Sequence, residues 1–286
     1  MRFTKMHGAG NDFLVLDAVA APLGIAPEAL PGLVRRICGR HTGIGADGVM
    51  VLEQPKGRAD VAMRFYNSDG SLGEMCGNGA RCVCRYACEQ GYAGDTVRVE
   101  TTAGLVTGWR KSRTEFRIRL NPPSVLETER LLDAGGRTYR CGYVELGDPG
   151  IPHLTVELPG LAGCDTQALR TLGRQLRQHP SLPKGANVNF YELTGPDTVL
   201  EKTYERGVED FTLACGTGTG SVAAVLTQTG RVSGKQVRFY MDGGLLTMDV
   251  GLRDGRALEL YLTGPTCVVC TGELSEELMD LKEEKR

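Results

Sequence analysis

Apolar and polar residues alternate along several short stretches of the chain. The alternation is clearest at 61–65, 97–99 and 116–120, where every second residue is Val, Met, Phe, Ile or Leu. A period of two predicts strands with one buried face. Such stretches outnumber the helical ones, and short hairpin-like turns recur between them, so the chain is predicted to be rich in sheet.

Helical spacing is found in three stretches outside the strands. One helix is expected over 31–39, and another begins at Asp165, a good N-cap residue, and ends before the His-Pro pair at 179–180. The charge-rich segment 272–286 carries leucines at helical spacing, which predicts a terminal surface helix.

Two further helical stretches carry the most informative pattern. They begin at Cys76-Gly-Asn-Gly and at Cys215-Gly-Thr-Gly, and they end at Gly91 and Gly230, which suit the left-handed C-terminal cap. The cysteines are 139 residues apart, and so are the two terminal glycines. Thirty-nine of the 286 residues are glycine, about twice average usage, and many of them cluster around these two cysteines.

The similarity between the two halves continues beyond the helices. Residues 97–99 match 237–239, and 103–107 match 243–247, both at an offset of 140. Upstream, Asn67 and Arg206 each lie nine residues before their cysteine and are expected to be equivalent. We interpret the pattern as an internal duplication. The predicted fold is α+β, with two pseudo-symmetric domains, 1–120 and 121–264, each a rolled mixed or antiparallel sheet around a central helix.

Charge and composition exclude several classes of protein. The net charge is −2, from 33 basic and 35 acidic residues. Because basic residues are not in excess, neither a nucleic acid nor an anionic membrane is predicted as a partner. The sequence contains no apolar run of about 18 residues, so no membrane span is predicted. The N-terminus lacks the apolar core of a secretory signal. A cytoplasmic protein is expected, with its ten cysteines reduced.

A cysteine at the start of a helix is placed for acid–base chemistry. The first turn has unpaired backbone N–H groups and a partial positive charge, which favour a thiolate and can hold a carboxylate. Two such helix starts, related by the duplication, predict one sulfur on each face of a bound group. Cys76 and Cys215 are therefore the candidate acid and base for inverting an amino-acid α-carbon, without a cofactor.

Other cysteines and histidines have simpler interpretations. Cys82, Cys84 and Cys88 lie inside the first helix and are expected to pack in the core. The pair at 267 and 270 has the spacing of half a zinc site but lacks a second half, so no metal is predicted. His153 is a candidate polar support residue.

The chain resembles the diaminopimelate epimerases, enzymes of lysine and cell-wall biosynthesis that use no pyridoxal phosphate. The resemblance is carried by Lys-Met-His-Gly-Ala-Gly-Asn-Asp-Phe at 5–13, Gly-Ile-Gly-Ala-Asp-Gly at 43–48, Asn-Ser-Asp-Gly at 67–70 and Tyr-Glu-Arg-Gly at 204–207, together with the two cysteine motifs. It covers nearly the whole chain.

The resemblance implies the roles of further residues. The two cysteines are the acid–base pair in this family. The backbone of Gly77, Asn78, Gly216 and Thr217 is expected to hold the reacting carboxylate of the small-molecule substrate. The distal end of diaminopimelate is expected to bind Asn11, Asn67, Asn187, Glu205 and Arg206. The resemblance also implies that residues 265–286 return to the first domain and that the protein is a homodimer.

The sequence departs from the family pattern in three places. Gly48 stands where some members have Gln, Ile151 stands where an Asn often precedes Pro-His, and the segment 209–212 has one extra residue, including Phe211. Three alternatives stay open: a racemase of another amino acid such as histidine on the same scaffold, a cysteine hydrolase using one cysteine with His153, and a non-catalytic binding protein.

Overall fold

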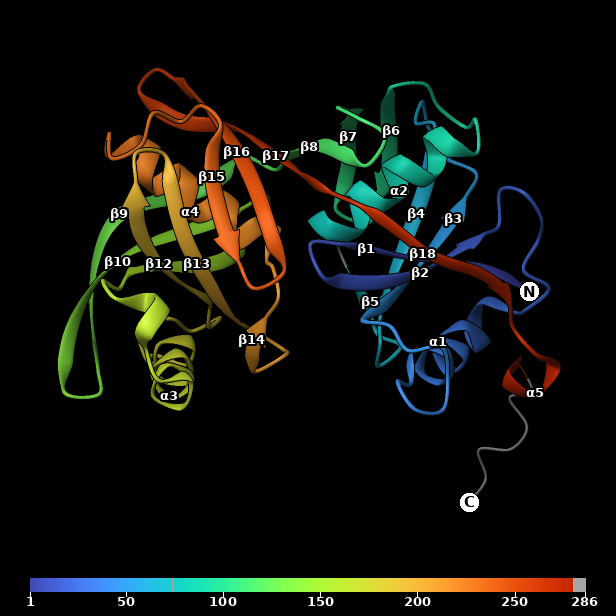
Figure 1. The fold of residues 1–286 in the computed structure, drawn as a ribbon, viewed down its shortest axis with the longest axis horizontal. Helices are drawn as coiled ribbons and strands as arrows, with labels where there is room; N and C mark the ends of the chain where they lie inside the picture. Colours follow the sequence, from blue (N-terminus) through green and yellow to red (C-terminus); the bar gives the residue numbers. More distant parts are fainter. Residues whose placement is uncertain (74, 280–286) are drawn as a thin grey trace. The chain divides into compact units, whose positions relative to one another are not determined.

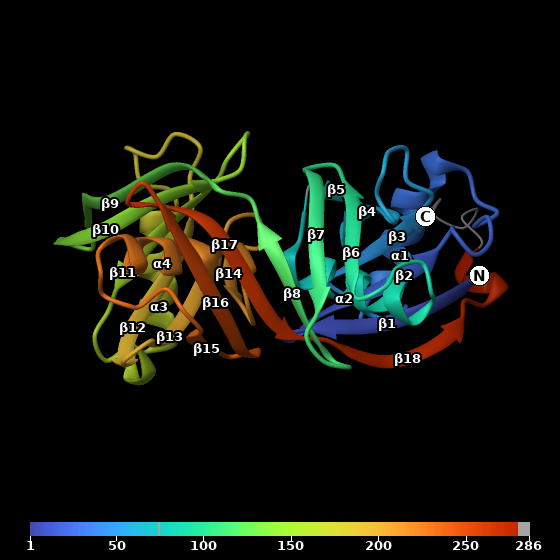
Figure 2. The same cartoon turned by 90° about the horizontal axis from the view of Figure 1, so that it is seen from above.

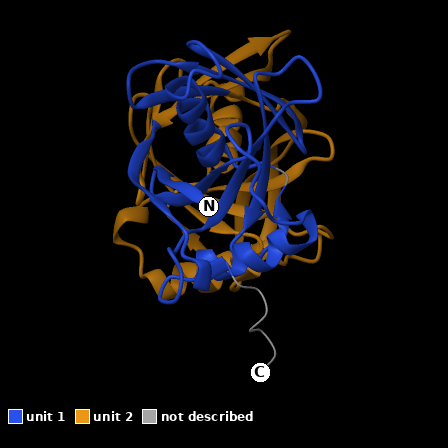
Figure 3. Ribbon diagram, turned by 90° about the vertical axis from the view of Figure 1, so that its right-hand side faces the viewer, with its two compact units in different colours: residues 1–118, 265–286 blue, residues 119–264 orange. Residues whose placement is uncertain are grey.

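The computed structural model describes residues 1–73 and 75–279. The chain divides into two compact units (Figure 3), and each contains one of the two cysteine motifs. Unit 1 comprises residues 1–118 and 265–286, and unit 2 comprises residues 119–264. The predicted α+β class is confirmed, because strands dominate both units and the helices are few.

Unit 1 is a mixed sheet around helix α2. Its strands are β1 (Arg2–Gly8), β2 (Asn11–Asp17), β3 (Gly48–Glu53), β4 (Val61–Asn67), β5 (Leu72–Gly73), β6 (Thr96–Thr101), β7 (Gly104–Arg110), β8 (Glu115–Leu120) and β18 (Cys267–Glu273), and its helices are η1 (Pro27–Ala29), α1 (Leu30–Cys38), α2 (Gly77–Glu89) and α5 (Glu276–Met279). The last two residues of β8 fall in unit 2.

The strands of unit 1 pair in the order β18, β1, β2, β3, β4, β6, β7, β8. The pairs β2–β3 and β4–β6 are parallel and the others are antiparallel. Strand β18 comes from the C-terminal end of the chain and runs along β1, red beside blue in Figure 2. Helix α2 packs against β1, β2, β3, β6 and β7, and α1 covers β3 and β4.

Unit 2 repeats this plan around helix α4 (Figure 1). Its strands are β9 (Pro123–Ala134), β10 (Arg137–Leu146), β11 (Ile151–Glu157), β12 (Asn187–Gly195), β13 (Thr198–Glu205), β14 (Asp210–Thr212), β15 (Val237–Met241), β16 (Gly244–Arg253) and β17 (Arg256–Pro265), and its helices are η2 (Leu161–Gly163), α3 (Thr166–Arg177) and α4 (Gly216–Gln228).

The pairing of unit 2 matches that of unit 1 strand for strand. The order is β9, β10, β11, β12, β13, β15, β16, β17, with β11–β12 and β13–β15 parallel. Strand β9, which begins unit 2, takes the place that β18 takes in unit 1, since each pairs antiparallel with the strand before the first parallel pair. Helices α2 and α4 each have 13 residues and begin 139 positions apart.

Several predicted helix boundaries are confirmed. The Asp165 side chain accepts a hydrogen bond from the backbone N–H of Ala168 and caps α3. Gly91 and Gly230 have φ of +77° and +68° just beyond the ends of α2 and α4, as left-handed caps require.

The predicted terminal helix over 272–286 is wrong at its start. Residues 272 and 273 close strand β18, and among the described residues the helix of this segment is α5, Glu276–Met279. Leu274, which precedes α5, is buried in the cluster that packs under α1 and ties this segment to unit 1, while α5 itself has no buried residue and lies at the surface as predicted. Leu281, the last leucine of that pattern, lies outside the described residues.

The strand register corrects one expected equivalence between the halves. Tyr66 pairs with Val49, and Tyr204 pairs with Val188, so β4 and β13 correspond at an offset of 138 rather than 139. Asn67 is therefore equivalent to Glu205, and not to Arg206. The reason is that the connection from β13 to Cys215 is one residue longer than the connection from β4 to Cys76.

Candidate functional site

Cys76 is the N-cap residue of α2. Its backbone is extended, with φ −126° and ψ 118°, and its carbonyl accepts the first helical hydrogen bond from the N–H of Ala80 at 2.8 Å. The side chain is half-buried, while Gly77 and Asn78 are buried in the first turn. The backbone N–H groups at the start of a helix favour an anion at this place.

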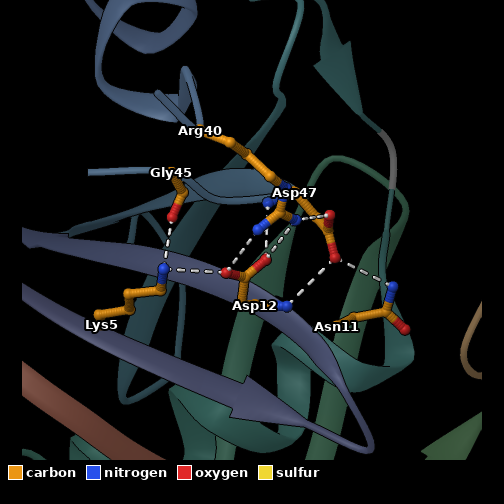
Figure 4. Close-up of polar contacts among 6 residues, drawn as sticks. All are labelled: Lys5, Asn11, Asp12, Arg40, Gly45 and Asp47. Atoms are coloured by element: carbon orange, nitrogen blue, oxygen red, sulfur yellow. Dashed lines mark hydrogen bonds and ion pairs between the residues drawn. The ribbon is translucent and has the colours of Figure 1, made fainter. Parts of the chain in front are cut away.

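Asn11 and Asn78 are joined to each other beside this helix start. The Asn78 Nδ2 donates to Asn11 Oδ1 at 2.7 Å, and the Asn11 Nδ2 donates to Asp47 Oδ2 at 3.3 Å. Figure 4 shows Asp47 in turn held by Arg40, which also binds Asp12. Arg40 and Lys5 hold the pKa of Asp12 below its ordinary value, although burial opposes that shift. Asn11 is thus fixed by a network of charged groups.

Asn67 ends strand β4 in the same unit. Its Nδ2 donates to Ser71 Oγ at 2.9 Å, and its register partner is Gly48. A Cβ at Gly48 would lie 2.6 Å from the Phe65 ring and 2.4 Å from the Tyr66 carbonyl oxygen. In this fold, a side chain at position 48 would therefore collide with Phe65 and with the backbone of Tyr66.

Cys215 caps α4 as Cys76 caps α2. Its φ of −121° and ψ of 103° match those of Cys76, and its Sγ lies 3.6 Å from Thr217 Oγ1. The cysteine is buried, and burial together with the nearby Glu205 carboxylate raises the pKa of its thiol well above the ordinary value. The hydrogen bonds from the Thr217 hydroxyl and the Gly218 backbone oppose the shift. In the described structure, Cys215 is therefore a protonated thiol.

The remaining predicted residues of unit 2 lie at the ends of β12 and β13. Asn187 Oδ1 accepts from the backbone N–H of Arg206 at 2.7 Å, and the Asn187 Nδ2 donates to the Pro152 carbonyl at 3.4 Å. The Arg206 side chain is exposed, and its Nη1 donates to the Lys184 carbonyl at 3.1 Å. Its guanidinium group is thus accessible for a ligand carboxylate.

His153 belongs to a buried hydrogen-bonded group that the sequence did not reveal. Asn189 Oδ1 accepts from Thr203 Oγ1 at 3.0 Å, and the Asn189 Nδ2 donates to the Leu154 carbonyl at 2.8 Å and to His153 Nδ1 at 3.2 Å. This assignment of the amide leaves the proton of a neutral His153 on Nε2. Burial, with a contribution from Arg206, lowers the pKa of His153 to about 3, so the ring is neutral.

The equivalent positions of unit 1 are apolar. By strand register, His153, Asn189 and Thr203 correspond to Phe13, Met50 and Phe65. Phe13 and Phe65 are in edge-to-face contact, with ring centroids 6.1 Å apart. The two units therefore share a backbone plan, but the layer beneath the helix start is apolar in unit 1 and hydrogen-bonded in unit 2.

The other two departures from the family pattern also have structural roles. Phe211 packs edge-to-face on Tyr204 with centroids 5.7 Å apart, so the extra residue in segment 209–212 is anchored in the core of unit 2. Ile151 begins β11 and pairs with Leu146. Cys82 and Cys84 are buried as predicted, while Cys88 is only half-buried. The Cys267 and Cys270 side chains are exposed on β18, and the described residues contain no metal-binding group of His, Cys, Asp or Glu.

Alanine at Gly218 is expected to destabilise unit 2. A Cβ there would lie 2.1 Å from Asn189 Oδ1 and 3.3 Å from Cys215 Sγ, so α4 or the Asn189 network must shift. We expect a loss of about 1–3 kcal/mol in the free energy of unfolding, measured in urea. Gly94→Ala is the control, because a Cβ there meets nothing within 4 Å. Equal effects of the two changes would contradict this description of the helix start.

Glu201 is a fully buried acid beside the start of α4. Its Oε2 accepts from Thr219 Oγ1 at 2.8 Å, and Thr219 Oγ1 also lies 3.0 Å from the Cys215 carbonyl. The Oε1 has no hydrogen-bond partner among the described residues. Burial raises the pKa of Glu201 to about 8, although the Thr219 hydrogen bond opposes this shift. The folded protein therefore holds Glu201 protonated at neutral pH.

Glu201→Gln is expected to remove a pH-dependent loss of stability. A raised pKa stabilises the folded state at acid pH, and this contribution is lost as the pH rises from the ordinary value of 4.5 to about 8. Between pH 5 and pH 8, the free energy of unfolding of the variant, measured in urea, should therefore rise relative to that of wild type by about 2–4 kcal/mol. A difference that does not change with pH would show that Glu201 is not protonated in the fold.

Comparison with known proteins decides the family. The family model described as diaminopimelate epimerase matches residues 3–124 and 147–269, which is most of the chain. The chain belongs to the diaminopimelate epimerase family. The diaminopimelate epimerase of Aquifex aeolicus is 38% identical, with 98% of this chain and 100% of that protein covered. That of Archaeoglobus fulgidus is also 38% identical, over 95% of each chain.

The fold is shared more widely than the sequence of the diaminopimelate epimerase family. A solved hydroxyproline epimerase from Agrobacterium vitis is similar at a TM-score of 0.71 with 20% identity, covering 98% of this chain and 92% of that one. This likeness supports the fold alone. In the described part of the chain, every helix is too short or too polar to cross a membrane.

Proposed function

We propose that the protein interconverts L,L- and meso-diaminopimelate, with Cys76 and Cys215 as the two acid–base groups and with no cofactor. The observation that carries the proposal is that two matched units each place a cysteine as the N-cap residue of a central helix, with nearly the same backbone angles. Membership of the diaminopimelate epimerase family supports the choice of substrate.

The proposed reaction needs one proton acceptor and one proton donor. A thiolate removes the α-proton of the substrate, the electron pair left on carbon spreads into the α-carboxylate, and the thiol of the other cysteine returns a proton to the opposite face. The enzyme ends with the thiol and the thiolate exchanged. The reverse reaction uses the same two groups in the opposite roles.

The backbone at the two helix starts is proposed to stabilise the charge that develops. The N–H groups of Gly77 and Asn78, and those of Gly216 and Thr217, are the donors for the reacting carboxylate. Donors aimed at developing charge are worth about 2.7–4 kcal/mol each in oxyanion sites. Several are needed, because an α-proton is far less acidic than a thiol.

The distal end of diaminopimelate is an amino acid in its own right. Arg206 is proposed to bind its carboxylate, since an exposed guanidinium can form two parallel hydrogen bonds. Asn11, Asn67, Asn187 and Glu205 are proposed to bind its ammonium group and to fix its orientation. His153 supports this half-site as a neutral group, because its pKa is lowered by burial.

We propose further that the protein is a cytoplasmic homodimer. Two thiols that act in acid–base catalysis must stay reduced, which favours a reducing compartment. Strand β18 supports association, because Val269 is 53% exposed there and an exposed strand can pair with another chain. Light scattering on the purified protein measures the mass directly.

An assay without added cofactor tests the proposed function. The protein is treated with a chelator and incubated with L,L-diaminopimelate, and the meso isomer is measured by chiral chromatography. Conversion at the rate of untreated protein is expected. L-Histidine serves as the comparison substrate, and faster racemisation of histidine than of diaminopimelate would favour the alternative racemase.

A further inference from the structure

Arg81 lies fully buried in helix α2, five residues after Cys76. It is among the largest completely buried side chains of the protein. Its Nη2 donates to Asn78 Oδ1 at 2.9 Å, and its Nη1 lies 3.4 Å from the Gly77 carbonyl oxygen. The guanidinium group therefore sits directly against the first turn of the helix that Cys76 caps.

The charge of Arg81 has no carboxylate partner in the described part of the chain, and its Nε has no hydrogen bond there. Arg85, one turn further along the same helix, is different. Its Nε is ion-paired with Glu89 at 2.8 Å, and its Nη1 donates to the Thr266 carbonyl at 2.8 Å. A buried charge without a counter-ion costs several kcal/mol, so an anion is expected near Arg81 when the protein is active.

Three thiols, those of Cys76, Cys82 and Cys84, interact electrostatically with the Arg81 guanidinium group. Burial lowers the pKa of Arg81, and negative charge on Cys82, Cys76 or Cys84 would oppose the shift. Burial raises the pKa of Cys82 to about 12 and that of Cys84 higher still, so both stay neutral near pH 7. An arginine remains protonated under these conditions. Of these three sulfurs, Cys76 is the one whose ionisation can balance the Arg81 charge.

The fold makes room for this guanidinium in unit 1 only. A Cβ at Gly8 of strand β1 would lie 3.3 Å from Arg81 Nη2 and 2.8 Å from the Asn78 carbonyl oxygen. In unit 2 the position equivalent to Arg81, 139 residues later, is Gly220, where a Cβ would lie only 2.7 Å from the Leu120 side chain. The buried ionisable side chains near the start of α4 include the acid Glu201 and the imidazole of His153, and neither carries a charge at neutral pH. The two half-sites therefore differ in charge.

We propose that Arg81 is a positioning residue of the first half-site. Its buried charge favours the Cys76 thiolate, and its guanidinium group holds Asn78 by a hydrogen bond and, through Asn78, also Asn11. For the epimerase reaction this inference rests on the proposed function. The effect on Cys76 itself does not, because a thiolate can be detected without any substrate.

The test is the rate at which iodoacetamide alkylates Cys76, followed by peptide mass spectrometry, with exposed Cys270 as the internal reference. Arg81→Met removes the charge but keeps an apolar side chain of similar length. We expect it to lower the Cys76 rate at pH 7 about tenfold, as a rise of one unit in the thiol pKa would. Arg81→Lys should restore most of that rate. Arg85→Met is the matched control and should leave the rate within about twofold of wild type.

Two results would overturn the inference. One is a Cys76 alkylation rate in Arg81→Met that equals the wild-type rate. The other is an alkylation rate in Arg81→Lys as low as in Arg81→Met, which would show that the shape of the Arg81 side chain matters and its charge does not. Melting temperatures and circular dichroism show which variants fold. If Arg81→Met does not fold, the pH dependence of the Cys76 alkylation rate in Arg81→Lys, compared with wild type, decides the question. Epimerase assays in parallel should show a fall mainly in kcat for Arg81→Met. A wild-type protein without activity would contradict the proposed function while leaving the alkylation result intact.

Discussion

Alanine at either Cys76 or Cys215 is expected to lower kcat/KM for epimerisation at least a thousandfold, which is about 4 kcal/mol of transition-state stabilisation. Inversion needs a proton acceptor on one face and a proton donor on the other, and loss of either leaves half of a reaction. Residues that act as one unit also give strongly non-additive losses, so the double variant should be little worse than each single one.

The control is Cys164→Ala. Cys164 is half-buried, and its Sγ donates to the Gly160 carbonyl at 3.5 Å in a loop before α3. This variant should retain wild-type activity, which shows that loss of a thiol alone is harmless. If Cys76→Ala or Cys215→Ala kept more than about a tenth of wild-type activity, a factor worth about 1.4 kcal/mol, the two-cysteine assignment would be wrong.

Arg206→Lys is expected to lower kcat/KM for diaminopimelate. The loss should correspond to about 2–3 kcal/mol of transition-state stabilisation, the upper range for a hydrogen bond to a charged group. Lysine keeps the charge but not the planar fork, and the two residues are not interchangeable where a carboxylate is bound by two hydrogen bonds. Part of the loss should appear in kcat, because binding energy at the distal end also positions the reacting carbon.

Two comparisons make the Arg206 result specific. Arg231→Lys changes an arginine that is ion-paired with Glu157 beyond the end of α4, and it should alter kcat/KM less than twofold. An amino acid without a distal carboxylate should be a very poor substrate, and Arg206→Lys should hardly change its rate. Equal losses for both substrates would show that Arg206 does not bind the distal carboxylate.

The plan of the fold is predictable from the sequence because the internal duplication repeats the same pattern of motifs in both halves. The matched Cys-Gly-x-Gly motifs, the terminal glycines at 91 and 230 and the N-cap at Asp165 are local signals, and each has a local physical cause in the structure. Strands β2 and β3 are harder to predict, since both faces are covered and their residues are almost continuously apolar rather than alternating.

The features that the sequence does not reveal depend on tertiary contacts. Arg81 and Glu201 have ionisable side chains, which are seldom fully buried, and only the packing around α2 and α4 shows that these two are. The link from His153 to Asn189 needs the register of β11 against β12, which sequence spacing does not give. Counting back from the cysteines matches Asn67 to Arg206 rather than to Glu205, because one extra residue before Cys215 shifts the count.

The central claim is that two thiols act on opposite faces of one α-carbon, and its most direct test is an isotope measurement. The protein is incubated with L,L-diaminopimelate in deuterated water without added cofactor, and both isomers are analysed at low conversion. Two separate bases predict that the meso product carries solvent deuterium at its inverted α-carbon, while the recovered L,L substrate remains unlabelled. Deuterium entering the recovered substrate as fast as the product from the first time points would indicate a single base and contradict the account.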